Sequence, residues 1–189
     1  MNKIISDTLA VAATLIGTKE EGQNHGKMID KIESLFGLTG QQYCVMFVLY
    51  CYMQACSQNN AKFLLPETAS SQTLFESAKK IGINYTDPRK IKPGDICIFR
   101  KYKLWEGHAA LINSYLKDDM TFETIEGNTY DNDFGSQREG DGIYKRIRKA
   151  QSLNFVESSF YIRGFIDMGQ LYPNNQVVTP DPVPRGLEC

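Results

Sequence analysis

Histidine, tryptophan and long apolar runs are scarce in this sequence. Only two histidines, His25 and His108, and one tryptophan, Trp105, occur among its 189 residues. Any chemistry that pairs a cysteine with a histidine therefore has very few ways to be assembled. No stretch approaches the ~20 consecutive apolar residues of a membrane-spanning helix, so we expect no membrane partner.

The sequence also lacks an excess of either charge. Its 21 Lys and Arg residues nearly balance its 22 Asp and Glu residues, for a formal net charge of −1. Nucleic-acid-binding proteins usually carry a basic patch or run, and no long basic run occurs here. We therefore expect no nucleic-acid partner, and nothing in the composition predicts assembly beyond a monomer.

Paired cysteines and metal-ligand clusters are missing as well. The five cysteines form no CxxC pair and no Cys/His cluster with metal spacing, which argues against a disulfide framework or a structural zinc site. Residues 131–135 look like the start of a calcium loop, but the full twelve-residue pattern with its distal glutamate is absent. We expect reduced thiols, no metal and no cofactor.

What the sequence does contain fits one globular domain that begins with helices. Hydrophobic residues make up 42% of the chain, enough for a proper core. Apolar spacing predicts helices over residues 4–16, 27–36, 44–56 and 66–80. The first of these competes with a secretory signal peptide. Asp7 interrupts the apolar run and no small-x-small cleavage site follows, which favours the helix.

The second half of the chain reads as strands. Alternating or continuous apolar runs predict strands over residues 96–99, 108–115, 120–126, 142–148 and 160–166, with Arg146 and Arg148 on a solvated face. Helices followed by strands indicate an α+β fold, with N-terminal helices packed on an antiparallel sheet of about five strands. We expect this domain to span residues 1–168. Residues 169–189 form a proline-rich tail that ends in what looks like a cloning remnant.

Cys44 is the first candidate for chemistry. A polar stretch led by Gly40 runs into this cysteine, which then opens the strongly apolar segment 44–56. A helix N-terminus offers free N–H groups and partial positive charge, both of which favour a thiolate. The alternative is a small, buried core residue, which this stretch taken alone favours.

Two later stretches supply partners for a cysteine nucleophile. His108 follows Gly107 at the start of a predicted strand and can serve as the base. Glu126 and Asn128 end the next strand, and residues two apart in an extended chain point to the same face. Either side chain there can accept a hydrogen bond from the imidazole and hold its tautomer. This order of cysteine, histidine and acid or amide favours catalysis over a core role for Cys44.

The sequence resembles the CHAP family, the cysteine- and histidine-dependent amidohydrolases/peptidases of the papain-like superfamily. The matching pieces span roughly residues 1–167: Glu21, Asn24-His25-Gly26, Tyr43-Cys44, Phe47-Val48, Lys92-Pro93-Gly94-Asp95-Ile96, Gly107-His108 and Ile125-Glu126-Gly127-Asn128. The resemblance implies a papain-like fold with the nucleophile Cys44 at the N-terminus of the central helix. It also implies His108 as general base, Glu126 as the residue that orients it and Asn128 as a fourth polar member.

The resemblance further implies hydrolysis of amide bonds in bacterial peptidoglycan through a thioester. Backbone N–H groups at the helix start would hold the oxyanion, and Gln41 or Gln42 could add a side-chain donor. The family generally has Trp or Gln just before the cysteine, where this chain has Tyr43. We expect Tyr43 and Trp105 to line the substrate groove.

Two alternative functions stay open at this point. Some CHAP members hydrolyse small soluble amides of the glutathionylspermidine type, and a CHAP-like scaffold could also bind cell wall without catalysis. Without a convincing signal peptide, we expect synthesis in a bacterial or phage-infected cytoplasm and action on the wall after release or delivery. A delivery partner or cognate inhibitor is compatible with that setting, but the sequence names neither.

Overall fold

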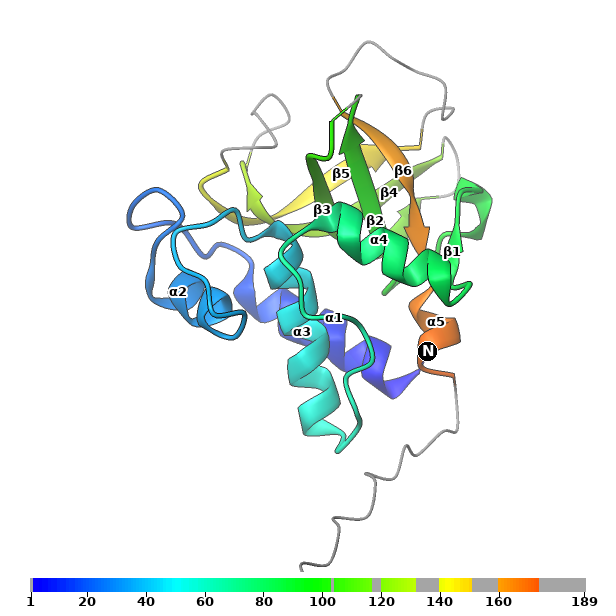
Figure 1. Ribbon diagram of the computed structural model, residues 1–189, viewed down its shortest axis with the longest axis horizontal. Helices are drawn as coiled ribbons and strands as arrows, with labels where there is room; N and C mark the ends of the chain where they lie inside the picture. The colour runs from blue at the N-terminus through cyan, green and yellow to red at the C-terminus, as the bar shows by residue number, and fades with distance from the viewer. Residues whose placement is uncertain (1, 103, 117–119, 132–139, 151–159, 174–189) are drawn as a thin grey trace, which may run out of the picture.

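The structure is a computed structural model that describes residues 2–102, 104–116, 120–131, 140–150 and 160–173. Helices come first, and most strands follow them (Figure 1). In chain order the elements are α1 (Lys3–Leu15), α2 (Lys27–Ser34), α3 (Cys44–Gln58), α4 (Ser71–Lys80), β1 (Asn84–Tyr85), the 3₁₀ helix η1 (Pro88–Lys90), β2 (Ile96–Lys101), β3 (Gly107–Leu116), β4 (Thr121–Thr129), β5 (Gly142–Lys149), β6 (Phe160–Ile166) and α5 (Met168–Leu171).

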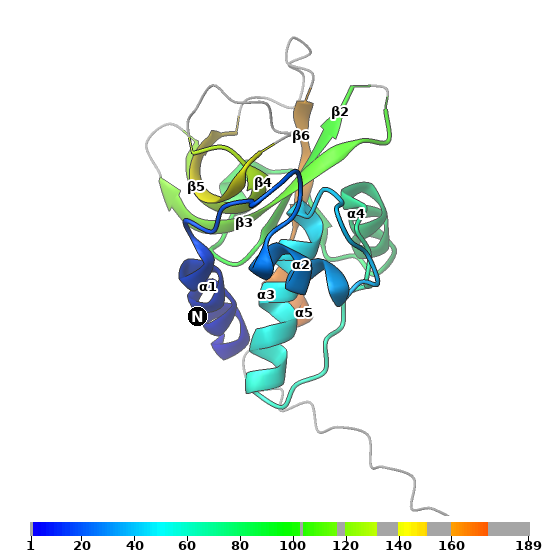
Figure 2. The ribbon, with the colours of Figure 1, turned by 90° about the vertical axis from the view of Figure 1, so that its left-hand side faces the viewer.

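The described strands form one sheet in the order β1-β6-β2-β3-β4-β5. Every neighbouring pair is antiparallel. Figure 1 shows α1, α2 and α3 below this sheet, and Figure 2 shows how strongly its strands curve. The expected α+β, papain-like arrangement is confirmed. The strand missing from the expectation is β1, whose two residues are too few to show an alternating pattern.

Helix α3 is the centre of the larger core. Its residues Val45–Leu49 are fully buried, and α1 packs along it through Ala12. A helix that is apolar nearly all round has no polar face for contact with water, so it is most stable when other elements cover it on all sides. Burying each such large side chain contributes about 1.5–3 kcal/mol. This burial fixes the start of α3 against β3 and β4.

A second core lies on the other face of the sheet. Successive side chains of a strand point to opposite faces, so Ile96 and Ile98 join the α3 core while Cys97 and Phe99 join the second one. Phe122 and Phe165 pack edge to face within this second core. The curved sheet therefore encloses a second apolar interior, and a polar group that enters it needs a partner.

The folded part of the chain extends past residue 168, where the tail was expected to begin. Met168 and Tyr172 are buried. The Tyr172 ring stacks on Tyr52 of α3, and its hydroxyl accepts a hydrogen bond from the Leu64 N–H at 3.1 Å. The boundary was wrong because the burial of Tyr172 depends on residues more than a hundred positions earlier. Residues 174–189 of the expected tail lie outside the described residues.

No helix in the described part of the chain is both long enough and apolar enough to cross a bilayer.

Candidate active site

Cys44 is the first residue of α3, as the sequence predicted. The loop before it is held by Glu33, a fully buried residue of α2. The Glu33 carboxylate accepts hydrogen bonds from the backbone N–H groups of Gly40 and Gln41, each at 2.6 Å. The chain thus approaches the helix from a fixed direction, and Cys44 emerges where the first N–H groups of α3 have no intrahelical acceptor.

The Cys44 thiol is almost buried, with 6% of the residue exposed. Burial by itself raises the pKa of a thiol. Here the charge and hydrogen bond of His108 outweigh burial, with help from the N–H groups of Ala109 and Val45, so the pKa of Cys44 lies below its ordinary value. A lowered pKa makes the thiolate, which is the nucleophilic form, available at lower pH.

His108 stands between Cys44 and Glu126. Its Nε2 lies 2.9 Å from the Glu126 Oε2, so Nδ1 is the ring nitrogen left to bond to the Cys44 sulfur. Burial alone would lower the pKa of His108, but Cys44 and Glu126 raise it to about 9. A proton on Nε2 that is donated to Glu126 leaves Nδ1 as the basic nitrogen, which is the tautomer a general base needs.

Glu126 is fully buried on β4, facing the second core. Its Oε1 accepts a hydrogen bond from the Thr124 hydroxyl and one from the Arg148 Nε at 2.7 Å. Arg148 also donates to Oε2, so the guanidinium and carboxylate form a two-bonded pair. Burial opposes ionisation, but Arg148 and His108 outweigh it and hold the pKa of Glu126 well below its usual range. The carboxylate therefore stays ionised against the imidazole.

The sequence that carries these contacts matches a known family. The model of the CHAP domain matches residues 37–128, which include Cys44, His108 and Glu126. The matched region is a CHAP domain. Among solved structures, it is similar to the crystal structure of Ly7917, at 13% identity and a TM-score of 0.44. That alignment covers 84% of this chain and 61% of the Ly7917 chain, so this chain spans less than two thirds of Ly7917. A search of curated proteins returned no match.

Asn128 ends the part of the chain that matches the CHAP domain. It is buried at a bulge in β4, with a positive φ of 54°. Its backbone N–H lies near the Tyr43 hydroxyl and acts to lower the pKa of that group, against the larger effect of burial. The bulge interrupts the two-residue alternation that was expected to put both Glu126 and Asn128 against His108. Glu126 supplies the carboxylate that bonds to the ring, and the role of Asn128 stays a prediction.

Tyr43 does not line a groove, contrary to the expectation. It is 0% exposed, and its hydroxyl lies against the Glu20 carboxylate. Burial and the charge of Glu20 raise the pKa of Tyr43 well above its usual range. Gly127 allows β4 to pass this close to α3, since a Cβ there would lie 2.8 Å from the Phe47 Cβ. Tyr43 is thus a buried link between the Glu20 loop, α3 and β4.

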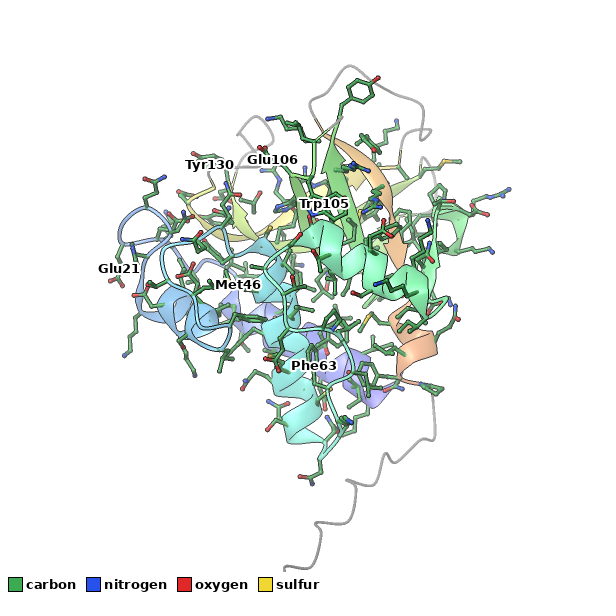
Figure 3. The ribbon with its side chains drawn as sticks, in the orientation of Figure 1. Glu21, Met46, Phe63, Trp105, Glu106 and Tyr130 are labelled. Atoms are coloured by element: carbon green, nitrogen blue, oxygen red, sulfur yellow. The ribbon has the colours of Figure 1, made fainter. Side chains whose placement is uncertain are left out.

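The remaining predicted groove residue, Trp105, is exposed. It lies between β2 and β3, three positions before His108, and is 57% exposed (Figure 3). The guanidinium groups of Arg100 and Arg163 lie 5.7 and 6.0 Å from its ring centroid. Two cations near one ring limit the positions that the indole can take. A groove role for Trp105 is compatible with this exposure and stays a prediction.

The two glutamines proposed for the oxyanion are both exposed. The side-chain amide of Gln41 donates to the Thr39 carbonyl at 3.3 Å, within its own loop. Gln42 lies two positions before Cys44. The oxyanion role of either glutamine therefore stays a prediction, and the backbone N–H of Cys44 is the donor that the start of α3 provides.

Arg148 is the site residue that sequence reasoning missed. Its side chain is only 10% exposed, and Arg146 on the same face is buried with a hydrogen bond to the Tyr130 carbonyl. The expectation that both arginines lie on a solvated face was wrong. The available signal was Glu126, because a buried carboxylate on β4 requires a cation on a neighbouring strand.

No group of three or more His, Cys, Asp or Glu side chains among the described residues is arranged to hold a metal ion. The sequence that looked like a calcium loop falls mostly within residues 132–139, which lie outside the described residues.

Proposed function

We propose that the protein is a cysteine amidase or endopeptidase that hydrolyses amide bonds of bacterial peptidoglycan through a thioester. CHAP domains are generally amidohydrolases or peptidases, and this chain has such a domain. The observation that carries the proposal is the hydrogen-bonded series Cys44, His108 and Glu126 at the start of α3. Nucleophile, base and orienting acid are the three parts that covalent amide hydrolysis needs.

The acylation step follows from this arrangement. His108 takes the proton of the Cys44 thiol, and the thiolate attacks the carbonyl carbon of the scissile amide. The negative oxygen of the tetrahedral intermediate accepts a hydrogen bond from the backbone N–H of Cys44. His108 then gives its proton to the departing amine as the C–N bond breaks, which leaves the acyl group on the sulfur.

Deacylation uses the same residues in reverse. His108 takes a proton from a water molecule, whose oxygen attacks the thioester carbonyl. The carbon–sulfur bond breaks, the product leaves as a carboxylic acid, and His108 returns its proton to the Cys44 thiolate, which restores the starting thiol. Through both steps Glu126 keeps the imidazole in one orientation and stabilises its cationic form.

The test is hydrolysis of purified peptidoglycan by the wild-type protein and by Cys44→Ala and His108→Ala. Both variants should lose activity while circular dichroism shows an intact fold. Cys51→Ala is the matched control, since Cys51 is a buried thiol of the same helix with a pKa raised by burial. Mass spectrometry of the released muropeptides identifies the bond that is cut. Full activity in Cys44→Ala would overturn the proposal.

The same samples separate the alternative functions. If the protein hydrolyses soluble amides but releases nothing from the wall, its substrate is a small soluble amide and not peptidoglycan. If it binds the wall without hydrolysing any amide, it is a binding module and not an enzyme. Peptidoglycan lies outside the cytoplasm, so we also propose that the protein acts after release or delivery to the wall.

A further inference from the structure

Arg148 and Glu126 form an enclosed ion pair next to His108. The Glu126 carboxylate is 0% exposed and the Arg148 side chain 10%. Arg148 uses two nitrogens, Nε on Oε1 and Nη2 on Oε2. Such a planar pair with two hydrogen bonds fixes the rotation of the carboxylate as well as its position. A single charged group such as the ammonium of lysine would fix only its position.

The same carboxylate oxygen serves both neighbours. Oε2 of Glu126 accepts from Arg148 and lies 2.9 Å from the His108 Nε2. Rotation of the carboxylate about its last bond would therefore move the atom that holds the imidazole. Phe99 packs against both ends of this arrangement, with its ring centroid 5.8 Å from that of His108 and 5.3 Å from the Arg148 guanidinium. The phenyl ring helps to keep water away from the pair.

We propose that Arg148 is a positioning residue that holds the Glu126 carboxylate in the one orientation that supports His108. The inference rests on the proposed function for the roles of Cys44 and His108, and it adds a fourth residue that acts through Glu126 without touching substrate. The four groups form a buried row of alternating charge: guanidinium, carboxylate, imidazolium and thiolate. Each charge is flanked by opposite ones, which offsets the cost of burial.

Removing the guanidinium should shift the titration of the whole row. Glu126 is faced by His108 from β3, Arg148 from β5 and the Cys97 thiol from β2. Without Arg148, burial dominates and Glu126 takes up a proton at higher pH. A neutral Glu126 stabilises the imidazolium less, and a less stable imidazolium stabilises the Cys44 thiolate less. Formation of the thiolate should therefore move to higher pH.

The experiment measures how fast iodoacetamide alkylates Cys44 as a function of pH, read by mass spectrometry of the Cys44 peptide. In Arg148→Met the midpoint should rise by about one pH unit or more, which corresponds to 1.36 kcal/mol per unit. With a soluble muropeptide substrate, kcat should fall by about 10- to 100-fold, the scale of a misplaced catalytic group. The acid limb of kcat/KM should move with the alkylation midpoint.

Arg148→Lys separates charge from geometry and serves as the second variant if Arg148→Met does not fold. Lysine keeps the positive charge but cannot form two parallel hydrogen bonds to the carboxylate. The pH midpoint of Cys44 alkylation in Arg148→Lys should therefore be closer to wild type than in Arg148→Met, while kcat stays reduced. Lys145→Met, on the same strand but with an exposed side chain, should match wild type in both readouts. An unchanged midpoint in folded Arg148→Met, or a wild-type kcat in Arg148→Lys, would overturn the proposal.

The alkylation readout needs no substrate. A shifted midpoint in a protein that hydrolyses no amide would uphold Arg148 as the positioning residue and reject the proposed function. If the wild-type protein hydrolyses amides but the alkylation midpoint of Arg148→Met is unshifted, the proposed function is upheld and Arg148 is rejected as the positioning residue.

Discussion

His108 Nε2 lies 2.9 Å from Glu126 Oε2, and the other side of the ring bonds to the Cys44 sulfur. The imidazole therefore contacts two groups with lowered pKa values, the carboxyl of Glu126 and the thiol of Cys44. Its own pKa is raised to about 9. Above the lowered pKa of Cys44 and below about pH 9, these shifts favour the thiolate and imidazolium that proton transfer from Cys44 to His108 produces.

That relationship predicts a bell-shaped dependence of kcat/KM on pH. The acid limb reports the thiol of Cys44, which loses its proton below its ordinary value because His108 is cationic. The alkaline limb should lie near pH 9, where His108 loses the proton that the leaving amine needs. Initial rates on a soluble muropeptide from pH 4 to pH 10 measure both limbs. A rate that climbs steadily through pH 9 would contradict the ion pair.

Glu126→Gln should damage both catalysis and stability. An amide offers one acceptor where Glu126 now accepts from His108 and Arg148, so at least one donor loses its partner. We expect kcat to fall by about 10²- to 10⁴-fold, and the free energy of unfolding to fall by about 3–5 kcal/mol because a buried cation is left unpaired. Urea titration and steady-state kinetics measure these changes. Glu123→Gln changes a half-buried neighbour on β4 that pairs with the exposed Lys145, and should cost about 0–1 kcal/mol.

Trp105 should affect substrate binding without affecting the thiol. A ring packed on a substrate is worth about 0.5–1.5 kcal/mol beyond its buried area, so Trp105→Ala should raise KM by about 2- to 12-fold. Trp105→Phe keeps an aromatic face and should raise KM less. The alkylation rate of Cys44 should match wild type in both variants. An unchanged KM in Trp105→Ala would remove this residue from the groove.

Tyr172 tests whether the segment after residue 168 belongs to the folded domain. Tyr172→Ala removes a ring that stacks on Tyr52 and should lower the free energy of unfolding by about 3–5 kcal/mol. Tyr172→Phe removes only the hydroxyl that bonds to Leu64 and Cys56, at a cost of about 0.5–1.5 kcal/mol. Equal stability of Tyr172→Ala and wild type would place the ring outside the cooperative core.

The sequence was informative wherever a local pattern decides the outcome. The apolar run after Cys44 indicated a buried central helix, and the alternation of β5 and β6 indicated strands. The order of Cys44, His108 and Glu126 was enough to expect their meeting. Each of these expectations depends on periodicity or on short motifs, which neighbouring residues define.

What the sequence could not show depends on partners far along the chain. On β5 the apolar side chain Ile147 is 52% exposed while Arg148 points inward, because Glu126 on the neighbouring strand requires its charge. A hydrophobic pattern predicts the opposite orientation. Tyr43 is a second example. It is adjacent to the nucleophile in sequence, but its side chain is buried against Glu20 and the end of β4.

The contact between Asn2 and Tyr172 has a consequence for protein engineering. The Asn2 amide donates to the Tyr172 carbonyl, so residues near the two ends of the described part of the chain meet, beside the C-terminal half of α3 where Cys56 bonds to Tyr172. Cys44 begins that helix twelve positions earlier, about 18 Å away along its axis. A binding module or affinity handle fused at either end would leave the domain from this remote side and spare the nucleophile. A short linker between the ends should also permit circular permutation.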